Sequence, residues 1–125
     1  MTPITIKDSA NVDCVFAIIR QPGGSLSGIL QAPVSGAGMN RTAYPKVEVS
    51  SRIVKGRAEP VVTVSVPFGT TVTGSFVPVG QVTHVHGAKL PPNAPDKARM
   101  DAEAFARNLL ANAQVQALLQ NGVVS

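Results

Sequence analysis

Two neighbouring segments of this sequence alternate between apolar and polar residues with a period of two. Segment 47–54 places Val47, Val49 and Ile53 on one side and Glu48, Ser50 and Arg52 on the other. Segment 61–66 places Val62, Val64 and Val66 on one side and Val61, Thr63 and Ser65 on the other. This period is typical of a β-strand with one buried and one solvated face. Because the linker 55–58 is short and contains a glycine, the pattern predicts a β-hairpin.

The amino-acid usage changes near residue 92, from Val, Thr, Ser, Gly and Pro to Ala, Leu, Gln and Asn. Before that point we predict further strands at 3–8, 12–20, 26–32 and 81–90, and a long loop over the Gly/Pro-rich segment 67–80. After it, Asn93 is the predicted cap of a helix with Pro95 and Asp96 in its first turn, and a break at Asn112 precedes a short second helix. The predicted class is α+β in one domain of 125 residues, with a β-hairpin and antiparallel sheet over 1–92 and one or two helices over 93–121.

The predicted first helix carries one apolar stripe, formed by Ala98, Ala102, Phe105, Leu109 and Ala113. A sheet of five or six strands is about 25–30 Å wide, whereas one helix is about 10 Å across. A single helix therefore leaves part of the sheet uncovered, and a second copy of the chain is the simplest cover. We predict an interlocked homodimer with Val47, Val49, Phe105, Leu109 and Leu110 in its interface.

The chain has 11 Lys and Arg against 7 Asp and Glu, and the excess lies entirely before residue 96. Five basic residues fall between Arg41 and Arg57, with only Glu48 to oppose them. Such an excess favours a polyanionic partner, nucleic acid above all, although a solvated basic edge that prevents aggregation is an equal alternative. The candidate RNA-contacting residues are Lys46, Ser50, Arg52, Lys55, Arg57, Thr63 and Ser65.

His84 and His86 lie two residues apart, so they share one face of a strand and could bind a metal. No third ligand stands at a motif spacing, so ordinary strand histidines are the favoured interpretation, and contact with nucleic acid is a further one. The single Cys14 is interpreted as a small apolar residue and excludes a disulfide framework within the chain. No phosphate-binding loop or nucleophile motif occurs. We predict no enzyme, no catalytic residue, no metal, no cofactor and no membrane span.

The order of these elements resembles that of the coat proteins of single-stranded RNA bacteriophages, the levivirus-like phages. The stretch from Tyr44 to Arg52, the basic glycine turn and segment 61–67 with its Val-Pro end are similar to the central hairpin of that family. Segment 68–80 resembles the loop that lines its five-fold and quasi-six-fold axes, and 96–119 resembles its paired helices.

The resemblance implies a T=3 icosahedral shell of interlocked dimers around viral single-stranded RNA, in a virion assembled in the bacterial host cytoplasm. It also implies binding of an RNA hairpin as a translational repressor. The last strand lacks the family's aromatic residue, and its register decides whether His84 and His86, or Thr83, Val85 and Gly87, face the RNA. Two alternatives stay open, namely a dimeric RNA-binding regulator that does not assemble and a small metal-dependent enzyme that uses His84 and His86.

Overall fold

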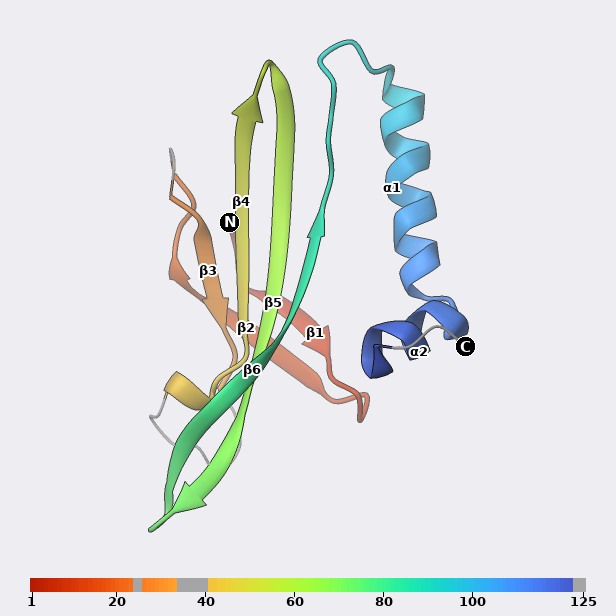
Figure 1. Cartoon of the computed structure of the whole chain (residues 1–125). Helices are drawn as coiled ribbons and strands as arrows, with labels where there is room; N and C mark the ends of the chain where they lie inside the picture. Colours follow the sequence, from red (N-terminus) through yellow and green to blue (C-terminus); the bar gives the residue numbers. More distant parts are fainter. Residues whose placement is uncertain (24–25, 34–40, 123–125) are drawn as a thin grey trace. The chain divides into compact units, whose positions relative to one another are not determined.

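The computed structural model describes residues 1–23, 26–33 and 41–122. It divides into two compact units, Met1–Lys89 and the segment from Leu90 onward. The first unit is a six-stranded antiparallel sheet in which each strand pairs with the next one along the chain (Figure 1). Its strands are β1 (Ile4–Lys7), β2 (Asp13–Arg20), β3 (Gly28–Gln31), β4 (Lys46–Val54), β5 (Arg57–Val72) and β6 (Ser75–Gly87), and the short helix η1 (Arg41–Ala43) precedes β4.

The predicted central hairpin is confirmed. β4 and β5 pair without interruption from Lys46↔Ser65 to Val54↔Arg57. The two residues between them, Lys55 (φ 52°) and Gly56 (φ 77°), both have positive φ. That conformation is typical of the two-residue turns whose twist matches the flanking strands.

The prediction of a long loop over 67–80 is wrong, because this segment forms a second hairpin. β5 and β6 stay paired out to Val72↔Ser75, with one bulge between Phe68 and Gly69. Thr73 (φ 50°) and Gly74 (φ 78°) make the turn. The turns before and after β5 lie at its opposite ends (Figure 1).

The two prolines that suggested a loop are compatible with this hairpin. β4 pairs with β5 only as far as Ser65, so the ribbon beyond that residue has two strands. In a two-stranded ribbon, many N–H groups point outward and need no partner, and proline is tolerated at those positions. Pro67 and Pro78 both lie in this part of the ribbon.

The core of the sheet unit is small. Its cluster of buried residues consists of Phe16, Leu30, Ala32 and Val47, and the half-buried residues Cys14, Ile18, Val49 and Val64 pack against them. This placement agrees with the interpretation of Cys14 as a small apolar residue. Several large apolar side chains of the same sheet stay exposed.

The second unit consists of α1 (Asp96–Leu110) and α2 (Ala113–Asn121). The helix begins later than predicted: Asn93 is not its cap and Pro95 is not in its first turn, because α1 begins at Asp96 and the extended residue before it is Pro95. Asn112 makes the predicted break, and its side chain accepts hydrogen bonds from the backbone N–H groups of Gln114 (2.9 Å) and Val115 (3.4 Å). No residue of either helix is buried in the single chain. Neither described helix has the length and apolar character of a membrane-spanning segment.

Candidate nucleic-acid interface

The register of β4, β5 and β6 determines which side chains share a face of the sheet, since directly paired residues point to the same side. The rows Lys46↔Ser65↔Thr83 and Glu48↔Thr63↔Val85 lie on one side. We call this side the polar face; it carries Lys46, Glu48, Ser50, Arg52, Arg57, Glu59, Thr63, Ser65 and Thr83, together with the apolar Val54, Val61 and Val85. The opposite side, the apolar face, carries Leu30, Val47, Val49, Ile53, Val62, Val64, Val66, Val82, His84 and His86.

His84 and His86 therefore do not join the predicted RNA-contacting residues. They pair with Val64 and Val62 on the apolar face, with their ring centroids 6.0 Å apart. The register places Thr83 and Val85 on the polar face instead. Among the residues that the structure describes, no group of three His, Cys, Asp or Glu side chains could hold a metal ion. Since His84 and His86 have no third ligand among these residues, the structure does not favour the alternative of a metal-dependent enzyme.

Ser65 lies on the polar face but is not open to a ligand. The residue is only 5% exposed, and its hydroxyl lies 3.4 Å from the hydroxyl of Thr83. The segment before β4 contributes Thr42 and Tyr44 to a small pocket at this corner, where Ser65 is part of the wall. The predicted role of Ser65 as an RNA contact thus loses its physical basis, because burial removes the hydroxyl from the surface.

A polar network crosses the middle of the face from β2 to β4. The Arg20 guanidinium donates to the carbonyl and hydroxyl oxygens of Ser27, both at 2.8 Å. The Ser27 hydroxyl donates to a carboxylate oxygen of Glu48 at 2.6 Å. The other oxygen of Glu48 lies 4.0 Å from the Lys46 ammonium. This network holds one negative charge in the centre of a basic surface, and the sequence pattern gave no sign of Arg20 as a member.

The end of the polar face next to the β4–β5 turn is the most basic part of the sheet. Arg57 donates two hydrogen bonds to one carboxylate oxygen of Glu59, at 3.2 and 2.9 Å. Arg52 lies 3.7 Å from the other oxygen. These hydrogen bonds from Arg57, and the nearby charges of Arg57, Arg52 and Lys89, hold the pKa of Glu59 below its usual value near 4.5 against an opposing effect of burial. Glu59 is therefore ionised near neutral pH.

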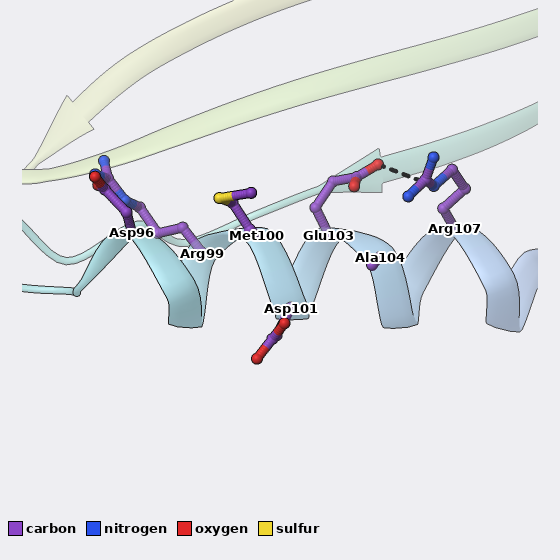
Figure 2. Close-up of a pocket in the computed structure, with 7 residues that line it drawn as sticks. All are labelled: Asp96, Arg99, Met100, Asp101, Glu103, Ala104 and Arg107. Carbon is purple, nitrogen blue, oxygen red and sulfur yellow. Dashed lines mark hydrogen bonds and ion pairs between the residues drawn. The ribbon is translucent and has the colours of Figure 1, made fainter.

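The charges of α1 are balanced by one another. Asp96 pairs with Arg99, Lys97 with Asp101 at 2.9 Å, and Glu103 with Arg107 at 3.4 Å. Figure 2 shows that most of these residues line one shallow side of the helix, together with Met100 and Ala104. Because each base has an acidic partner one turn away, this helix offers no surplus charge to a polyanion.

Large apolar side chains are exposed on both units. On the apolar face, Ile53 is 75% exposed, and Val62, Val66 and Val82 are exposed as well. On α1, Phe105 is 74% exposed, and Leu109 and Leu110 are also exposed. Of the predicted interface residues on β4, Val47 belongs instead to the core of its own chain and Val49 packs against that core.

No family model matches the chain, and no curated protein matches it in sequence. Solved structures match it over nearly its whole length. The chain of the virus-like particle of bacteriophage NT-214 has a TM-score of 0.85 at 17% identity, and the match covers 100% of this chain and 98% of that one. The virus-like particle of Beihai levi-like virus 21 gives 0.83 at 12% identity, with 98% and 95% covered. The capsid protein of bacteriophage GA gives 0.65 at 14% identity, with 94% and 92% covered. The chain thus has the fold of the coat proteins of levivirus-like RNA phages, as the resemblance implied.

Proposed function

We propose that this chain is the coat protein of a levivirus-like single-stranded RNA bacteriophage. Its role is structural, and it carries out no catalysis. The observation that supports this proposal best is the extent of the structural likeness, which includes the sheet and both helices and leaves almost nothing unmatched in either chain. The chain would then reside in the virion after assembly in the bacterial cytoplasm, with viral RNA and further copies of itself as its partners.

The basic unit of the shell is an interlocked homodimer. Ile53 and Val82 on the apolar face, and Phe105 and Leu109 on α1, are exposed in the single chain. Burying one such side chain in an interface contributes about 1.5–3 kcal/mol to the stability of the dimer. A second copy provides the complementary surface for each set, so the apolar face of one protomer receives the helix stripe of its partner. We propose that these dimers then assemble into a T=3 shell.

The polar face lines the inside of the shell and contacts RNA. Lys46, Arg52, Lys55 and Arg57 contact phosphates, while Ser50 and Thr63 contact sugars or bases with short hydroxyl groups. The same face binds an RNA hairpin and represses translation of a viral gene. The charge balance of α1 supports the choice of the sheet over the helices for this role.

Size-exclusion chromatography with light scattering and absorbance at 260 nm tests the shell. We expect particles of megadalton mass that contain nucleic acid. A stable dimer that binds RNA at every concentration tested would support the alternative of a non-assembling regulator. A soluble monomer would contradict both the shell and the dimer.

Variants of the basic residues test the RNA face. Arg52→Ala and Lys46→Ala should each lower the slope of log affinity against log salt by about 0.7, the value for one phosphate contact on a single strand. Lys97→Ala is the matched control, because it removes a base that pairs with Asp101 on α1. If all three variants behave like the parent protein, the RNA face lies elsewhere.

A further inference from the structure

We propose that Glu59 is a positioning residue that holds Arg52 and Arg57 side by side as a clamp for RNA backbone phosphates, with Lys89 as a third cationic member. This inference rests on the proposed packaging of RNA. It adds two residues, Glu59 and Lys89, to the basic end of the polar face, and it gives an acidic side chain a role in binding a polyanion.

The geometry of the carboxylate supports this role. One oxygen of Glu59 accepts from the Nε (3.2 Å) and a terminal nitrogen (2.9 Å) of Arg57, and the other lies 3.7 Å from a terminal nitrogen of Arg52. Arg52 and Glu59 are also direct partners in the β4–β5 register. Two guanidinium groups of like charge are thus held next to each other by one carboxylate between them.

The exposure of the three side chains shows which of them can meet a ligand. The Glu59 side chain is 12% exposed, whereas those of Arg57 and Arg52 are 38% and 75% exposed. An arginine has five N–H donors, and Glu59 engages only one edge of each guanidinium. The donors left over are available to the oxygens of a phosphate, which the planar guanidinium matches in geometry.

Lys89 comes to the same end of the sheet through the last backbone contacts of β6. Gly87 pairs with Val61, and the N–H of Ala88 donates to the carbonyl oxygen of Pro60 at 3.1 Å. The next residue, Lys89, therefore lies near Glu59, and its charge helps to lower the pKa of that carboxyl. Within the described part of the chain, no ion pair engages the Lys89 ammonium.

For the variant Glu59→Gln, the clamp and the net charge of the protein predict opposite changes in affinity for RNA. Glu59→Gln makes the protein more positive, so long-range attraction alone predicts tighter binding of RNA. If Glu59 positions the arginines, its loss lets them adopt other rotamers, and they must be ordered again when a phosphate binds. Binding then becomes weaker although a negative charge has been removed.

The experiment measures binding of a fluorescent oligouridylate to the full chain over a salt series, at protein concentrations where light scattering detects no particles. Glu103→Gln is the matched control, since it removes a carboxylate that pairs with an arginine, Arg107, on α1 and outside the polar face. We expect Glu59→Gln to bind about ten-fold more weakly, as for the cost of ordering the two arginine side chains on binding. Its salt slope should stay close to that of the parent, because both arginines still contact phosphates once they are ordered, whereas Glu103→Gln should bind as tightly as the parent.

Two further variants keep the proposal testable if Glu59→Gln does not fold. Arg57→Lys retains the charge but loses the two-donor contact with Glu59, so it should show the same weakening. Lys89→Ala should lower the salt slope by about 0.7. Folding of each variant is checked by thermal unfolding.

The possible failures are distinguishable. If the parent protein does not bind the oligouridylate, or binds it without salt dependence, the RNA role is wrong and the clamp falls with it. If the parent binds with a steep slope but Glu59→Gln or Arg57→Lys binds as tightly as Glu103→Gln, the RNA role stands and the clamp is refuted.

Discussion

The substitution Phe105→Ala tests whether the chain forms the proposed dimer, because its expected effect on the free energy of unfolding differs between the dimer and the isolated chain. In the single chain this ring is 74% exposed, so the substitution there should change the free energy of unfolding by less than about 0.5 kcal/mol. If a partner's sheet covers the ring, the same change costs about 3–5 kcal/mol. The dimer contains two such rings, so its loss amounts to about 6–10 kcal/mol. Because about 1.4 kcal/mol corresponds to a factor of ten, the dissociation constant of the dimer should rise by about four orders of magnitude or more.

Met100→Ala is the control for this prediction. Met100 is 70% exposed on the same helix and lies about 140° from Phe105 around the helix axis, outside the stripe that contains Phe105. We expect this variant to stay within about 0.5 kcal/mol of the parent. Urea unfolding at several protein concentrations, together with the elution volume at each, measures both effects. Equal effects of the two substitutions would refute the reasoning that the Phe105 side of α1 is the covered side.

Three further predictions use other parts of the chain. His84→Asp should prevent dimer formation, because it puts a charge on the apolar face. Thr83→Asp, on the polar face, should leave the dimer intact and weaken RNA binding, and size-exclusion chromatography and RNA titration distinguish the two outcomes. Gly69→Ala should leave the dimer folded but change or block particle closure in electron micrographs, because a Cβ at this position would lie 2.0 Å from a backbone oxygen of β6. The contribution of Glu59 to stability should be fully present above about pH 4.5 and disappear as the pH falls through its lowered pKa, so the parent should lose stability relative to Glu59→Gln only in acid titrations below that pH.

The sequence was sufficient to predict the elements whose local pattern agrees with their surroundings. The alternation of 47–54 and 61–66 identified β4 and the middle of β5, and Asn112 marked the true break between the helices. The segment 67–80 was misjudged because proline and glycine usually end a strand. In this ribbon, Pro67 and Pro78 are tolerated, since no third strand needs their missing N–H groups.

Which residues make up the candidate nucleic-acid interface could not be predicted from local sequence patterns alone. Whether His84 or Thr83 shares a face with Thr63 follows from the register between β5 and β6, and a shift of one residue would exchange them. Ser65 alternates like an exposed residue, but tertiary contacts bury it. Glu59 looks like an isolated acid in the sequence, and its position between two arginines becomes visible only when β4 and β5 are paired.

The unbroken pairing of β4 with β5 also determines how this protein can accept change in length. An insertion of one residue within β4 would turn every following side chain of that strand to the other side, so that Arg52 would point to the apolar face and Ile53 to the polar face. An insertion of two residues would restore the orientation of the side chains beyond it and displace the turn by one repeat of the strand. Related sequences should therefore differ in the length of this hairpin by even numbers of residues in each strand, and a library of insertions selected for assembled particles should retain the even lengths and lose the odd ones.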